Sequence, residues 1–189
     1  MPLVLNGATS GSTTIQATDA TTQTITLPAN SGTVLTSLST QSQFPANIAG
    51  NGPAFSAYLA SNTSISSGTF TKVTFDTEEF DTNSNFASSR FTPTVAGYYQ
   101  VNTGVAFGWA SITRAILAIY KNGSQYKIGN DLGGSNITNA LMTSAVIYMN
   151  GSTDYLEVYG YSAGTTLSFY GAAGGTQYTW FNGAMIRSA

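Results

Sequence analysis

Short alternations of apolar and polar residues run through the chain from residue 54 to residue 186. A period of two is typical of β-strands that bury one face. No segment of 12 or more residues shows the 3.6-residue period of an amphipathic helix. The pattern therefore predicts an all-β domain. The expected strands are Ala54–Ala60, Phe70–Phe75, Gly97–Phe107, Ala115–Lys121, Leu141–Met149, Tyr155–Tyr161, Thr165–Tyr170 and Tyr178–Ile186.

Two Asn-Gly pairs, Asn122-Gly123 and Asn150-Gly151, stand between apolar alternations. Asn-Gly is the strongest short-range signal for a two-residue β-hairpin, because both turn residues must adopt a positive φ. We therefore expect tight hairpins at both places, within an antiparallel sandwich or barrel.

Several of the expected strands are apolar on both faces, as in residues 115–120, 141–149 and 180–186. One face can enter the core of a sandwich, but a lone domain rarely exposes a large apolar patch. No helix is predicted that could cover the second face, so we expect subunits to associate, in a number that this pattern does not fix. The residues assigned to the core or to the subunit interface are Tyr99, Val101, Ile119, Leu141, Ile147, Tyr159, Trp180, Phe181 and Met185.

Residues 1–43 differ in composition from the rest of the chain. They contain 17 Ser or Thr residues and a single charged residue, Asp19, and this mixture is too polar to bury a core alone. One interpretation is a disordered, low-complexity tail. The favoured one is an extended β-rich tail, ordered by sister chains or by a docking surface, with strands at Thr24–Leu27 and Thr33–Thr36. Residues 44–53 have the Pro, Gly and Asn content of a linker. The expected organisation is thus a tail over 1–43, a linker over 44–53 and a head over 54–189.

Five motifs of the head resemble, in the same order, those of the globular head domain of complement component one-q, within the tumour necrosis factor-like superfamily. They are Pro53–Ser56, the stretch from Phe86 to Tyr99 with its Pro-Thr-Val-Ala-Gly-Tyr, and the segments AILAIYKNGSQ, STDYLEVYGY and TWFNGAMI. The chain departs from that family at Ser89, where Gly is usual, and in its few charged surface residues. The resemblance implies a jelly-roll sandwich of about ten strands that packs as a homotrimer about a threefold axis.

The tail segment GSTTIQATDATTQTITLPANSGTVLTS resembles the N-terminal segments of bacteriophage tail-fibre and other virion proteins. This resemblance implies that the tail docks on other virion proteins. The start, MPLVLNG, lacks the basic region and the apolar length of a signal peptide, which fits a phage protein assembled in the host bacterial cytoplasm better than a secreted animal protein. The candidate docking residues are Leu3, Val4, Leu5, Ile15, Ile25 and Leu27.

The composition limits the activities and partners that we expect for the chain. Charged residues make up 7% of the chain and the net charge is −2, so nothing suggests a basic patch for nucleic acid, and no apolar run is long enough for membrane insertion. The chain has no cysteine and no histidine, so thiolate chemistry and the commonest general base are both missing. The six basic residues are spread along the sequence and read as surface groups. We expect no enzyme activity and no cofactor.

One carboxylate cluster stands out, in the segment DTEEFD, and has three interpretations. A solvated loop is favoured, oxygen ligands for calcium are the second, and a glycosidase pair is the third. The residues concerned are Asp76, Glu78, Glu79 and Asp81.

Tyrosine and tryptophan side chains suit both sugar stacking and protein interfaces. The C-terminal third is rich in them, and we favour a role in the core or on the threefold axis for most. Loop residues that are less tied to the core could form an exposed binding rim. The candidates are Trp109, Tyr126, Asn130, Asp131 and Asn136.

The sequence thus favours a non-enzymatic bacteriophage virion protein, a trimeric short fibre on the exterior of the particle whose jelly-roll knob attaches to a host-surface glycan or protein. The main alternative is a trimeric capsid decoration or head-fibre protein that reinforces the shell. A polysaccharide depolymerase and a secreted animal-type head domain are further alternatives.

Overall fold

The computed structural model describes residues 3–6, 12–15, 51–108, 111–134, 140–164 and 168–189. The chain divides into two units, Met1–Ser37 and Leu38–Ala189. In the first unit, β1 (Leu3–Asn6) pairs antiparallel with β2 (Ser12–Ile15). The candidate docking residues Leu3, Val4, Leu5 and Ile15 lie in this hairpin. Ile25 and Leu27, with the strands expected at Thr24–Leu27 and Thr33–Thr36, lie outside the described residues.

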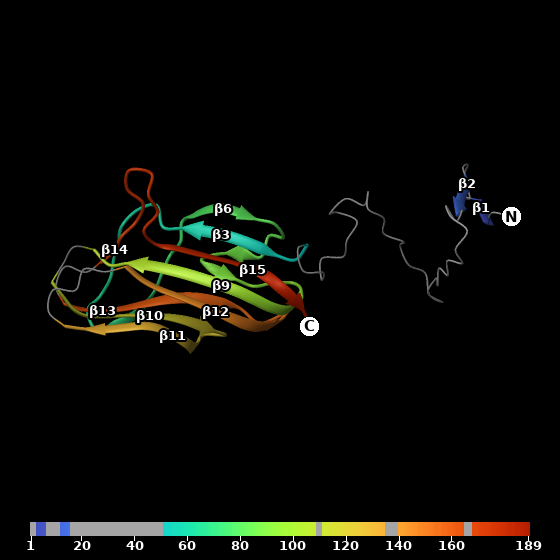
Figure 1. Cartoon of the computed structure of the whole chain (residues 1–189). Coiled ribbons are helices and arrows are strands. Elements are labelled where there is room, and N and C mark those ends of the chain that lie inside the picture. The colour runs from blue at the N-terminus through green and yellow to red at the C-terminus, as the bar shows by residue number, and fades with distance from the viewer. Residues whose placement is uncertain (1–2, 7–11, 16–50, 109–110, 135–139, 165–167) are drawn as a thin grey trace. The chain divides into compact units, whose positions relative to one another are not determined.

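The second unit contains the head, a sandwich of two antiparallel sheets (Figure 1). We call the first the β9 sheet, with the strand order β12-β9-β15-β3-β6. Its strands are β3 (Ala54–Tyr58), β6 (Thr77–Asp81), β9 (Ala96–Ala106), β12 (Ala140–Asn150) and β15 (Trp180–Ser188).

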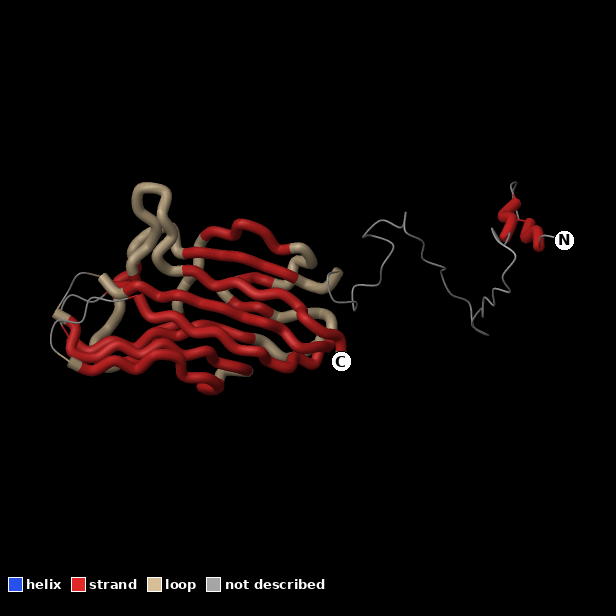
Figure 2. Tube along the Cα trace, viewed as in Figure 1, coloured by secondary structure: helices blue, strands red, loops and turns tan. Residues whose placement is uncertain are grey.

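The second sheet, the β10 sheet, has the order β11-β10-β13-β8-β7, and β5 also pairs with β13. Its strands are β5 (Thr69–Lys72), β7 (Phe86–Ala87), β8 (Arg90–Phe91), β10 (Ile112–Lys121), β11 (Ser124–Gly133) and β13 (Leu156–Gly164). A short pair, β4 (Thr63–Ser64) with β14 (Ser168–Phe169), closes one end. Strands and loops account for all described residues of the head, as the sequence predicted (Figure 2).

Apolar side chains of the two inner faces fill the space between the sheets. Phe55 of β3 stacks on Phe91 of β8 with ring centroids 4.3 Å apart, and meets the ring of Phe181 edge-on at 4.8 Å. Such contacts join the two sheets through directed aromatic packing. Of the residues assigned to core or interface, those buried in the core are Tyr99, Val101, Ile119, Leu141, Ile147, Phe181 and Met185. The other two, Tyr159 and Trp180, are half-buried.

All eight expected strands correspond to observed ones, except that residues 165–167 lie outside the described part of the chain. Two segments that were expected to be loops are strands. The carboxylate segment is not a loop, because Thr77–Asp81 forms edge strand β6. The loop candidates Tyr126, Asn130 and Asp131 belong to strand β11 and not to a loop. Nearly every side chain of β11 is exposed, so the strand has no buried face that could reveal its period.

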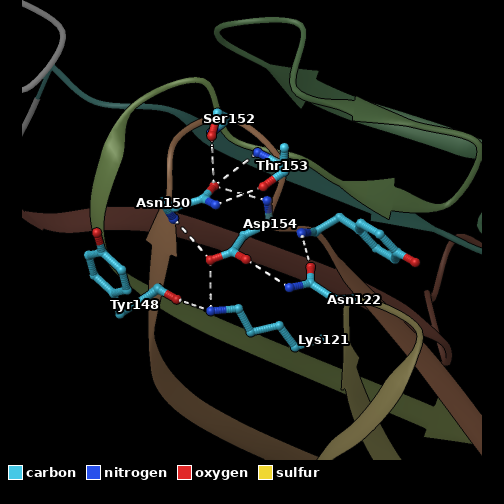
Figure 3. A network of polar contacts seen from close by, with 8 residues as sticks. Lys121, Asn122, Tyr148, Asn150, Ser152, Thr153 and Asp154 are labelled. Atoms are coloured by element: carbon cyan, nitrogen blue, oxygen red, sulfur yellow. Dashed lines mark hydrogen bonds and ion pairs between the residues drawn. The ribbon is translucent and has the colours of Figure 1, made fainter.

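The two Asn-Gly turns also differ. Asn122 and Gly123 have φ values of 55° and 77°, which confirms the tight hairpin between β10 and β11. At the second pair only Gly151 has a positive φ, of 70°, so the expected tight hairpin is wrong. Asn150 instead ends β12, and its Oδ1 accepts hydrogen bonds from the backbone N–H groups of Ser152, Thr153 and Asp154 (Figure 3). A side-chain acceptor therefore closes a longer turn.

Candidate functional site

The outward face of the β9 sheet carries exposed apolar side chains. On β9, the buried residues Tyr99 and Val101 alternate with Tyr98, Gln100 and Asn102, which face outward. The outward residues of β12 lie directly opposite, because Tyr148 pairs with Tyr98 and their rings are 5.5 Å apart. Six large apolar residues of this sheet are between 42% and 59% exposed, and these are Phe80, Tyr98, Met142, Val146, Tyr148 and Ile186. We call this set the apolar face.

A row of polar side chains crosses the middle of the apolar face. The Nε2 of Gln100 donates to Ser144 Oγ at 2.6 Å and to Asn102 Oδ1 at 3.1 Å. The Nδ2 of Asn102 then donates to Asn182 Oδ1 at 3.0 Å. These amides satisfy one another within the subunit, so covering the face would leave fewer polar groups without partners.

A second group of exposed apolar residues lies on the neighbouring edge strand β11. Tyr126, Ile128 and Leu132 are 49%, 55% and 36% exposed, and we call them the edge patch. Strand β11 lies beside β12, where the N–H of Met142 donates to Asn130 Oδ1 at 3.1 Å. Two apolar surfaces therefore meet at one edge of the sandwich.

The outward face of the β10 sheet is covered by its own aromatic residues. Tyr120 of β10 stacks on Tyr159 of β13 with centroids 4.0 Å apart, and Tyr161 packs on Phe70 of β5 at 5.3 Å. The rings lie half-buried, and burial raises the pKa of Tyr120 and of Tyr159. Of the aromatic residues noted in the C-terminal third, Phe169 is in the core.

One buried carboxylate on this sheet is held by two cations. Glu157 of β13 is 4% exposed in its side chain, and its Oε1 lies 2.7 Å from Lys72 Nζ and 2.9 Å from an Arg90 terminal nitrogen. Burial by itself would raise the pKa of Glu157, but the hydrogen bonds and charges of Lys72 and Arg90 outweigh it, so the pKa lies below its ordinary value. Glu157 therefore stays ionised. The Arg90 guanidinium also lies 3.8 Å above the ring of Tyr155.

Beside this cluster is an open hollow of about 450 Å³. It lies where strands β5, β7 and β8 meet the turn that precedes β7. Its lining residues are Lys72, Ser84, Asn85, Ala87, Ser88, Arg90, Thr92 and Thr94. We call it the cationic hollow.

The predicted binding rim does not come together as a set of loops. Trp109 and Asn136 lie outside the described residues. Tyr126, Asn130 and Asp131 are all on strand β11. Asp131 is held by Arg114 of β10, with Oδ2 2.8 Å from a terminal nitrogen, and this hydrogen bond lowers the pKa of Asp131. Asn130 and Asp131 are thus engaged in contacts within the head.

The four candidate metal ligands make separate contacts. Asp76 Oδ1 accepts from the Ala60 N–H at 2.6 Å, and Asp81 Oδ2 accepts from the Phe86 N–H at 2.7 Å. Glu79 accepts hydrogen bonds from Gln177 and Ser56, which lower its pKa. In the described part of the chain, no group of three or more acidic, histidine or cysteine side chains is placed to hold a metal ion. Glu78, Glu79 and Asp81 lie on β6, and Asp76 directly precedes it.

Four of the basic residues that were expected to be surface groups are engaged in ion pairs, and their side chains range from 16% exposed at Lys121 to 50% at Arg114. Lys72 and Arg90 contact Glu157, Arg114 contacts Asp131, and Lys121 contacts Asp154. Sequence reasoning missed these pairs because the partners are between 17 and 85 residues apart along the chain. Among the described residues, no helix is long and apolar enough to cross a membrane.

No protein-family model matches the chain, and no curated protein matches its sequence. Among solved structures, the globular domain of zebrafish complement 1qA protein is similar with a TM-score of 0.53 and 20% identity, over 72% of this chain and 98% of that one. Murine APRIL (TM-score 0.49, 13% identity, 70% and 98% covered) and the PRD1 vertex protein P5 (0.47, 13%, 71% and 97%) are also similar. The head therefore has the jelly-roll fold of the globular complement 1q domain, as the sequence motifs predicted.

Proposed function

We propose that the chain forms a homotrimer and serves as a non-enzymatic structural protein of a bacteriophage virion, a short fibre whose knob attaches to the host surface. The observation that carries the proposal is the apolar face of the β9 sheet, six large side chains each more than two-fifths exposed. Soluble monomers rarely leave such a patch in water. A sister subunit is the natural cover for this face, because the sequence predicts no helix that could cover it.

The two exposed apolar surfaces support a cyclic arrangement. Around a threefold axis each interface is heterologous, so a patch of one subunit meets a different patch of the next. The apolar face and the edge patch of β11 supply two such patches within one subunit. We infer that the edge patch of each subunit packs against the apolar face of its neighbour, and the amides of Gln100, Asn102 and Asn182 can be covered because they bond to one another within the subunit.

Placement on a virion is supported by the tail. Its segment from Gly11 to Ser37 resembles virion proteins, and a docking segment joined to a knob is what a fibre requires. Attachment by such a fibre is multivalent, since three knobs per trimer and several fibres per particle turn weak contacts into firm binding. The head, residues 54–189, would then be exposed to the host and the tail, residues 1–43, to the particle.

The proposal is tested first by the mass of the full-length chain in solution, measured by light scattering, where we expect three copies. A chain lacking residues 1–43 should remain a soluble trimer and should no longer incorporate into particles. A monomeric product of that deletion would contradict the interface proposed for the head. Immunogold labelling of particles then separates tail from head, since label confined to the capsid would favour a decoration protein.

A further inference from the structure

We propose that the cationic hollow binds a carboxylated saccharide, a sugar ring that carries one carboxylate beside its hydroxyl groups. The inference deepens the proposed function and rests on it in taking a host-surface glycan as the natural target. It assigns a site to that contact, on the β10 sheet and not on the apolar face.

Charge is the first argument. Lys72 and Arg90 both line the hollow, and within the described part of the chain the one carboxylate that they contact is Glu157, so the cluster carries two positive charges against one negative. A local excess of one positive charge stands out in a chain whose net charge is −2. The lining itself contains no acidic residue. One carboxylate of a ligand would balance the excess.

Donor count gives the second argument. The Lys72 ammonium has three donors and uses two of them, on Glu157 Oε1 and on the carbonyl oxygen of Ser88, at 2.7 and 2.9 Å. Arg90 has five donors and directs its Nε and a terminal nitrogen to Glu157. Donors of Arg90 therefore remain for a ligand, on a side chain that is 42% exposed.

The two cations are also held in place before any ligand arrives. Glu157 is fixed within β13, and it draws both side chains to the same oxygen atom. The ring of Tyr155 supports the Arg90 guanidinium at 3.8 Å, a contact that orients the planar group. A fixed cationic group loses less side-chain entropy on binding than a free surface lysine or arginine. Glu157 and Tyr155 are thus positioning residues.

The rest of the lining suits a sugar. Ser84, Ser88, Thr92 and Thr94 contribute hydroxyl groups, and ring hydroxyls of a saccharide can exchange hydrogen bonds with them. The hollow, of about 450 Å³, falls within the range of ligand sites of roughly 300 to 1,000 Å³. It is open on one side, which leaves room for the chain of a polysaccharide to continue.

Backbone strain is concentrated in the same lining. Ser84 and Ser88 of the lining, and the buried Ser89 next to it in the chain, have φ values of 54°, 51° and 57°, a left-handed conformation that costs a non-glycine residue free energy. Strained residues gather where geometry serves binding. The clustering of these serines near Lys72 and Arg90 agrees with a binding site. The proposal itself rests on the charge and the lining of the hollow.

The test uses the full-length protein and one position, Ala87. This residue is exposed, lines the hollow and pairs directly with Arg90 across the β7–β8 hairpin. Ala87→Glu places a carboxylate opposite the guanidinium and removes no hydrogen bond of the Ala side chain. Ala87→Gln is the matched control, since it has the same size without the charge. Calorimetric titration with a galacturonic acid trisaccharide, its methyl ester and an oligomer of glycerol phosphate should compare the ligands.

We expect the trisaccharide to bind the parent chain and Ala87→Gln alike, and Ala87→Glu at least tenfold more weakly. The methyl ester should bind at least tenfold more weakly than the acid, and the acid should lose affinity as salt rises. Equal binding of acid and ester would overturn the carboxylate assignment while leaving a glycan-binding knob intact. Tighter binding of the glycerol phosphate oligomer, or no binding of the acid, would also overturn it. A monomeric chain that still binds the acid would contradict the trimer and support the hollow.

Discussion

Lys121 of β10 and Asp154 of the β12–β13 turn form an ion pair of 2.8 Å between Nζ and Oδ2, with only 16% and 12% of the two side chains exposed (Figure 3). Lys121 Nζ also donates to the carbonyl oxygen of Tyr148 on β12. Asn122 donates to the other carboxylate oxygen of Asp154 at 2.7 Å. A residue of the β10 sheet is thereby tied to the end of the β9 sheet, and the pair closes one end of the sandwich.

The change Asp154→Asn tests this closure. It removes the charge that faces Lys121 and replaces one accepting oxygen, which faces donors, with an amide NH2 group that is itself a donor, so a mostly buried ammonium loses its anionic partner. We expect a loss of about 2 kcal/mol in the free energy of unfolding, somewhat less than for a fully buried pair. The measurement is guanidinium unfolding followed by circular dichroism. The matched control is Asp131→Asn, at the exposed pair with Arg114, which should leave the unfolding midpoint nearly unchanged.

The same pair should give the head an acid-sensitive component. Burial would raise the pKa of Asp154, but the hydrogen bonds from Asn122, Lys121 and the Asn150 backbone keep it below its ordinary value of 3.8. The folded state therefore favours the ionised form, so its stabilisation is present above pH 3.8 and is lost as the pH falls further. Unfolding midpoints measured from pH 7 to pH 2 should fall less steeply for Asp154→Asn than for the parent chain. Parallel curves would contradict this role of Asp154.

The proposed interface predicts a charge-sensitive trimer. Val146 of the apolar face and Ile128 of the edge patch are 51% and 55% exposed in the single subunit. Val146→Glu and Ile128→Glu should each convert the trimer into monomers, because a carboxylate would be buried without a partner. Thr74→Glu, at an exposed position outside both patches, is the control and should remain trimeric. Light scattering after gel filtration measures the outcome. A trimer that survives Ile128→Glu but not Val146→Glu would exclude β11 from the interface.

The β7–β8 turn predicts opposite consequences at adjacent serines. Both turn residues have positive φ, so glycine at either would relieve backbone strain. Ser88 is exposed, and its backbone carbonyl, which a glycine would keep, accepts the hydrogen bond from Lys72, so Ser88→Gly should stabilise the head by about 0.5 to 1 kcal/mol. Ser89 is buried, and its Oγ donates to the carbonyl oxygen of Phe75 at 3.1 Å. Ser89→Gly should therefore gain nothing or lose stability, as thermal unfolding of both variants can show.

The sequence predicted the sandwich because its long strands carry the alternation on which such predictions depend. Strands β9, β10, β12 and β15 each have an inner face that packs in the core, and that face leaves a period of two in the sequence. Strand β11 has no buried face and was missed. The tight turn expected at Asn150 was wrong because the signal of the Asn-Gly pair is local, whereas Asn150 uses its side chain to close a longer turn.

The cationic hollow could not be predicted for a different reason. Its two cations lie on β5 and β8, and the carboxylate that fixes them lies on β13, 85 residues after Lys72. Sequence spacing gives no sign of such a cluster, because strand order in a jelly roll brings together segments that are distant along the chain. The basic residues were the available sequence signal for this cluster. Because they stand apart from one another in the sequence, they were interpreted as surface groups. Strand β13 pairs with β5, β8 and β10, and this topology brings Lys72 and Arg90 to the same oxygen atom of Glu157.

The last prediction concerns Tyr99, the buried tyrosine next to the exposed Tyr98. Its hydroxyl donates to the carbonyl oxygen of Val95 at 2.7 Å, and burial raises its pKa from 10.0 to about 12. Tyr99→Phe should cost about 1 kcal/mol at neutral pH, since the carbonyl loses its partner. A pKa raised on folding means that the stabilisation is complete below pH 10 and disappears as the pH rises toward 12. The parent chain should therefore lose more stability between pH 9 and pH 12 than Tyr99→Phe, as circular dichroism during denaturant unfolding can measure. An alkaline loss that is equal in both would mean that another group causes it, and the half-buried Tyr120 and Tyr159, whose pKa values are also raised, would be the next to replace.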